Sequence, residues 1–76
     1  MLSYIVRLVQ EFEYTHGVHP NLLYLNETHL QHLQQGLRDG HNLQHLRDML
    51  HMDIIITRES VHPHVMWAHT AYRLAG

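Results

Sequence analysis

The chain has 76 residues, the length of one small domain, and a chain this short buries only about 60% of the surface that its unfolded form exposes. Its 45% apolar content predicts a folded core, and the absence of cysteine excludes disulfides and thiolate metal sites. Five arginines, no lysine and seven carboxylates give a net charge of -2, which argues against nucleic acid as a partner. We expect one domain over residues 1–76, with residues 70–76 as a flexible tail.

The apolar runs of the chain are four or five residues long, whereas a helix needs about 20 to span a bilayer. The N-terminal stretch also carries acidic groups where a signal peptide would be hydrophobic. The sequence therefore predicts a cytoplasmic protein that does not bind membranes.

The first predicted element is an amphipathic helix over residues 2–15, because apolar residues recur there at steps of three and four. Ser3 is the expected N-cap. Gly17, which can adopt the left-handed conformation, and Pro20, which cannot continue a helix, predict where it ends.

A short apolar run over residues 22–25 predicts a central strand. Asn26 then caps a second helix that Gly36 and Asp39-Gly40 close. The expected core side of this helix consists of Leu30, Leu33 and Leu37.

Asn42 caps a third predicted helix, whose expected core residues are Leu43, Leu46, Met49 and Leu50. Residues 53–57 contain three consecutive isoleucines and predict a strand. After a turn at residues 58–60, residues 61–68 predict a last strand, and Pro63 places it at an edge of the sheet.

The predicted order is helix, strand, helix, helix, strand, strand, which makes the fold α+β. The helical crossover makes the first two strands parallel, and the short turn makes the last two antiparallel. A three-stranded mixed sheet with helices packed on one face satisfies each apolar stripe.

From Gly17 onward, the stretches GVHPNLLYLNETHLQHL and LRDMLHMDIIITRESVHPHVMW resemble a segment of tailed-phage major capsid proteins. The resemblance covers about residues 17–67. It implies a compact α+β module used for protein contacts. The chain is much shorter than a capsid subunit, so shell assembly is not expected of it.

Ten of the 76 residues are histidines, and charging all of them in mild acid takes the net charge from -2 to +8. Three pairs have the close spacing that metal ligands need: His29 with His32, His41 with His45, and His62 with His64. The first two pairs have a simpler explanation as solvated residues on polar helix faces.

His62 and His64 flank Pro63 and point to the same side of an extended strand, so they are the best candidate metal ligands. Asp53 or Glu59 could complete such a site if it lay on a neighbouring strand or turn. The alternative is that polar side chains here keep an edge strand from pairing with other molecules.

The remaining histidines have local explanations, His16 at a helix C-terminus and His51 at a helix-to-strand junction. A catalytic set of Ser60 with a histidine and a carboxylate can be imagined, but only because histidine is so frequent in this chain. With no cysteine nucleophile or glycine-rich phosphate loop, we predict that the chain is not an enzyme and has no cofactor.

Aromatic residues and methionine are enriched at protein contacts, which makes Tyr24, Met66 and Tyr72 candidates, while Trp67 is assigned to the core. We expect a small accessory domain of bacterial or phage type that binds a protein partner, or a second copy through residues 61–68. The alternatives are a histidine-based binder of a divalent transition metal and a pH-responsive module.

Overall fold

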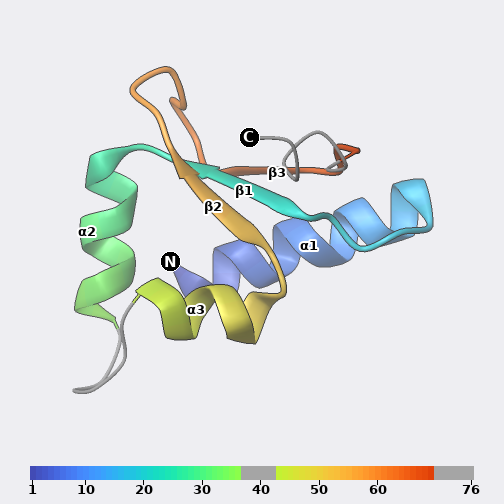
Figure 1. The fold of residues 1–76 in the computed structure, drawn as a ribbon, viewed down its shortest axis with the longest axis horizontal. Helices are drawn as coiled ribbons and strands as arrows, with labels where there is room; N and C mark the ends of the chain where they lie inside the picture. Colours follow the sequence, from blue (N-terminus) through green and yellow to red (C-terminus); the bar gives the residue numbers. More distant parts are fainter. Residues whose placement is uncertain (37–42, 70–76) are drawn as a thin grey trace.

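Figure 1 shows the computed structural model of the chain, which describes residues 1–36 and 43–69. The elements in chain order are α1 (Leu2–His16), β1 (Leu22–Leu25), α2 (Glu27–Gln35), α3 (Leu43–Leu50), β2 (Asp53–Ile56) and β3 (His64–Met66). This order and the α+β class are as predicted. The predictions made for Leu37, Asp39-Gly40, Asn42, His41 and the tail lie outside the described residues.

Helix α1 ends where the sequence predicts. Gly17 has a φ of 75°, in the left-handed region, and its N–H donates to the carbonyl of Glu13 at 2.8 Å. The predicted N-cap is wrong, because Met1 occupies that position without a side-chain cap and Ser3 lies in the first turn. The helix starts this early because Leu2 already packs against the core.

The N-terminus of α2 is fixed by the side chain of Asn26, as predicted. Its Oδ1 accepts a hydrogen bond from the N–H of His29 at 2.8 Å, while its own N–H donates to Nδ1 of His29 at 3.1 Å. This reciprocal pair is a capping box in which histidine replaces the usual glutamate. Asn26 Nδ2 also donates to the carbonyl of Ser60 at 2.9 Å and so ties the helix start to the segment before β3.

Helix α3 buries Leu46 and Leu50, but the prediction that Met49 faces the core is wrong, since this side chain is exposed. Met49 lies one residue before Leu50 on the helix and therefore turns away from the buried side. His51 ends the helix in a left-handed conformation with a φ of 56°, and its N–H donates to the carbonyl of Arg47 at 2.8 Å.

The three strands lie in the order β2-β1-β3. Strands β1 and β2 are parallel, as predicted, with Leu23 opposite Ile54. The predicted antiparallel pairing of the last two strands is wrong, because β3 pairs with β1 instead and places Val65 opposite Leu23. The reason is that β1 carries three buried leucines and gains most from having a neighbour on both sides.

Strand β3 is shorter than the predicted residues 61–68. The chain leaves the ladder after Met66 because Asn21 binds the backbone of Ala68 instead. Asn21 Nδ2 donates to the carbonyl of Ala68 at 2.7 Å, and the N–H of Ala68 donates to Asn21 Oδ1 at 2.9 Å. This side-chain clamp fixes where β3 ends.

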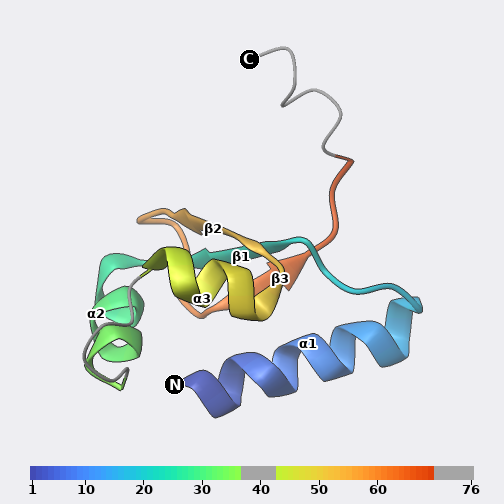
Figure 2. The same ribbon diagram turned by 60° about the horizontal axis from the view of Figure 1, so that its bottom comes forward.

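All three helices lie on one side of the sheet, as predicted (Figure 2). The core between helices and sheet consists of Ile5, Val9, Leu23, Leu25, Leu33, Leu46, Leu50 and Met52, with Leu2, Leu30, Ile54 and Val65 packed against it. None of the helices in the described ranges is long and apolar enough to cross a membrane.

Candidate protein-contact surface

His62 and His64, the predicted metal ligands, lie just before and at the start of β3, and both are exposed. Nδ1 of His64 lies 3.4 Å from the carbonyl oxygen of His62 and 3.4 Å from Oγ of Ser60. The His64 ring stacks on Tyr24 of β1, with ring centroids 4.7 Å apart and an angle of 13° between the planes. His64 is thus held by Tyr24 and by the backbone of His62.

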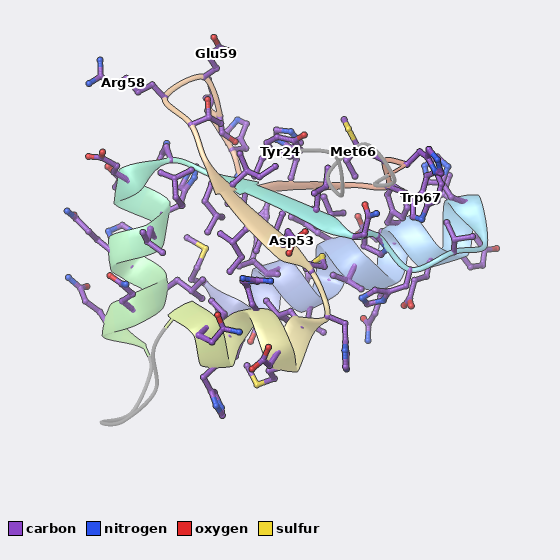
Figure 3. The ribbon with its side chains drawn as sticks, viewed as in Figure 1. Tyr24, Asp53, Arg58, Glu59, Met66 and Trp67 are labelled. Atoms are coloured by element: carbon purple, nitrogen blue, oxygen red, sulfur yellow. The ribbon has the colours of Figure 1, made fainter. Side chains whose placement is uncertain are left out.

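The carboxylates proposed to complete this site lie elsewhere. Asp53 is on β2, on the other side of β1 from β3, and its Oδ1 is 3.0 Å from Nη2 of Arg47. Glu59 is exposed at the turn after β2 and points away from the molecule (Figure 3). Within residues 1–36 and 43–69, no three histidine or carboxylate side chains are grouped so that they could hold a metal ion.

Ser60, the nucleophile of the conceivable catalytic set, lies close to a histidine, His64. Its side chain is buried, with only 3% exposed, and its hydroxyl donates to the carbonyl of His62 at 2.9 Å. The same oxygen lies 3.4 Å from the carbonyl of Tyr24. These contacts give the hydroxyl a structural role, which is to close the turn that leads into β3.

Two other histidines have roles that the sequence reasoning missed. His29 completes the capping box of α2, and the spacing of Asn26 and His29 would have indicated it had histidine been considered as an acceptor. His19 lies between two acceptors, with Nδ1 3.1 Å from Oε2 of Glu13 and Nε2 3.0 Å from the carbonyl oxygen of Leu50. His19 therefore links the end of α1 to the end of α3.

The most exposed large apolar side chains of the sheet are at the end of β3. Met66 is 44% exposed and Trp67 is 51% exposed, so the prediction that Trp67 belongs to the core is wrong. The strand ends at Met66, and the alternation that would turn Trp67 inward ends with it. Figure 3 shows both residues along the part of the sheet that runs beside the second half of α1.

A groove of about 440 Å³ lies between α1 and these residues, lined by Phe12, His16, Val18, Val65, Met66 and Trp67. A second hollow of about 500 Å³ follows α1 toward its start, lined by Met1, Ser3, Tyr4, Arg7, Leu8 and Glu11. We define the α1–β3 face as the apolar residues Tyr4, Leu8, Phe12, Val18, Met66 and Trp67. Tyr4, Val18, Met66 and Trp67 in this set are exposed.

Within residues 1–36 and 43–69, no strand pairs with the outer side of β3, so the α1–β3 face borders a free edge of the described sheet. On β1, the carbonyls of Asn21 and Leu25 accept hydrogen bonds from β2, from Asp53 at 3.0 Å and from Thr57 at 2.8 Å. Successive residues of a strand direct their backbone groups to alternate sides. The even-numbered residues of β1 therefore face β3.

This alternation decides which residue of β3 has free backbone groups. Leu22 is opposite Met66 and Tyr24 is opposite His64, so these two residues of β3 direct their N–H and C=O groups toward β1. Val65 lies between them and directs its N–H and C=O to the outer edge. An added strand would find its first hydrogen-bonding partner there.

Comparisons with protein families, with curated proteins and with solved structures found no match for this chain. The resemblance of residues 17–67 to a phage capsid segment therefore stays a prediction, as do the metal site and the cytoplasmic location.

Proposed function

We propose that this chain is a small accessory domain that acts by binding another protein chain through the α1–β3 face. The observation that carries the proposal is the exposure of Met66 and Trp67 directly beside the free edge of β3. Aromatic residues and methionine supply much of the contact energy in protein interfaces, and an unpaired strand offers backbone hydrogen bonds to an incoming segment.

The shape of this face supports the same proposal. The groove is lined by the half-buried Phe12 and Val65 and by the exposed Val18 and Trp67. A central apolar depression with exposed anchors around it is the arrangement in which a partner side chain becomes fully desolvated.

A photo-crosslinking amino acid at position 67 tests the proposal. In cells that make the protein, we expect Trp67→p-benzoylphenylalanine to form a discrete crosslinked product and to lose it when Met66→Asp is added. The matched control is p-benzoylphenylalanine at Gln10, an exposed residue on the flank of α1 toward α3. Equal crosslinking from both positions, or none from position 67, would contradict the proposal.

A further inference from the structure

We infer that the chain bound at the α1–β3 face is a second copy of this protein, related by a twofold axis that pairs β3 with β3 and α1 with α1, both antiparallel. This inference rests on the proposed function and names its partner. Three features of the face are self-complementary in that arrangement: the backbone of β3, the charges of α1 and the apolar stripe of α1.

The first feature is the backbone of β3. If the twofold axis passes at Val65, the outward N–H and C=O groups of the two Val65 residues bond to each other. The N–H of each Trp67 then faces the carbonyl of Pro63 in the second copy. Pro63 has no N–H of its own, and in this register the only group it leaves without a partner is the carbonyl of Trp67.

The second feature is the charge on the exposed side of α1. The helix spans Leu2–His16, so Val9 is its midpoint, and Arg7 and Glu11 lie two residues before and two after it. Both side chains are exposed and line the hollow along α1. When the helix packs antiparallel against itself with the twofold axis passing at Val9, Arg7 of each copy lies beside Glu11 of the other.

The third feature is the apolar stripe of Tyr4, Leu8 and Phe12 along α1. Phe12 lines the groove beside β3, and Tyr4 and Leu8 line the hollow that follows the helix toward its start. In the same antiparallel packing Leu8 lies near the axis, and Tyr4 lies near Phe12 of the second copy. An isologous interface of this kind buries the same surface twice and closes, so it yields a dimer with a continuous six-stranded sheet. A second copy also carries a net charge of only -2, which opposes the contact weakly.

Charge reversal on the full 76-residue chain tests the arrangement. In Arg7→Glu each interface holds two glutamate pairs, and in Glu11→Arg it holds two arginine pairs. We expect each variant alone to self-associate about tenfold more weakly than the native chain, from two ion pairs made repulsive. When the two variants are mixed, each contact again joins a glutamate to an arginine, and association returns to near its native strength.

Sedimentation equilibrium over a range of concentrations measures the result, with Arg58→Glu on the turn after β2 as the matched control. Circular dichroism of each variant verifies that it is folded. A native chain that stays monomeric at millimolar concentration, or single variants that associate as strongly as the native chain, overturns the inference. A monomeric chain whose position 67 still crosslinks to a different protein overturns the self-pairing and leaves the proposed function standing.

Discussion

The two edges of the sheet differ in how their ends are protected. Strand β2 begins with Asp53, whose carboxylate is 3.0 Å from the guanidinium of Arg47, and is followed by the charged turn residues Arg58 and Glu59 (Figure 3). Strand β3 instead ends at the exposed Met66 and is followed by the exposed Trp67. Charges at the ends of an edge strand discourage pairing with other molecules, and apolar residues invite it. The ends of β2 thus carry charges that discourage pairing with another strand, whereas the end of β3 carries apolar side chains that favour it.

Both edge strands pair with β1. Leu23→Ala truncates the side chain of β1 that lies beside residues of both edge strands. Leu23 is fully buried and lies opposite both Ile54 and Val65. We expect the free energy of unfolding to fall by about 2–5 kcal/mol, which is most of the stability of a domain this small. Urea unfolding measures the change. Tyr14→Ala on the exposed side of α1 is the control and should shift stability by less than about 0.5 kcal/mol.

Asn21→Ala tests whether the two edges of the sheet are stabilised independently. It removes both side-chain hydrogen bonds to Ala68, of 2.7 and 2.9 Å, and leaves the backbone bond from Asp53 to the carbonyl of Asn21 in place. We expect a loss of about 1–3 kcal/mol. In hydrogen exchange, the amide of Ala68 should lose its protection while that of Thr57, which donates to β1 on the β2 side, keeps most of its own. Equal loss at both amides would mean that the edges do not act independently.

The link between the two edges, from Thr57 to Pro63, is attached to α2 through Asn26, which also caps that helix. His29 completes the capping box, because its Nδ1 accepts from the N–H of Asn26 at 3.1 Å. We expect this cap to contribute about 1 kcal/mol to the free energy of unfolding.

His29→Gln keeps an acceptor for the N–H of Asn26, so we expect its free energy of unfolding to match that of the native chain. His29→Ala removes the acceptor and should lower the free energy of unfolding by about 1 kcal/mol. Urea unfolding measures both variants, and an equal loss in the two would contradict the role of His29 as the acceptor in the capping box.

Arg47→Gln tests whether Arg47 protects the β2 edge from pairing, and it has the smallest expected effect on stability among the test substitutions. The ion pair with Asp53 is partly exposed to solvent, with side-chain exposures of 44% and 26%, so its loss should cost less than about 1 kcal/mol. The more informative readout is self-association, which should not become stronger, because the carboxylate of Asp53 still lies at the start of β2. Stronger association would mean that Arg47, and not Asp53, protects this edge.

The end of α1, the start of α2 and the central strand could be predicted from the sequence because their causes are local. Gly17 ends α1 through its own conformational freedom, and Asn26 caps α2 through contacts within one turn. The parallel pairing of β1 and β2 follows from the length of the crossover alone. In each case the residues that decide the structure are close together in the chain.

The strand order and the roles of the histidines could not be predicted, because they depend on distant contacts. Nothing in residues 61–68 indicates that β1 is a better partner than β2; that choice is made by the buried leucines of β1. His19 contacts a carbonyl 31 residues away, and the clamp from Asn21 to Ala68 spans 47 residues. The proposal of Asp53 as a ligand beside His64 failed for the same reason, since β1 lies between them.

Amide hydrogen exchange at the outer edges tests the central claim most directly. Val65 directs its N–H to the free edge of β3, and by the same alternation Ile54 directs its N–H to the free edge of β2. In dilute solution both amides should exchange quickly. As the protein concentration rises, we predict that Val65 becomes protected while Ile54 does not. Protection of Ile54 alone, or no concentration dependence at either amide, would contradict the claim that β3 is the edge at which this protein binds a second copy.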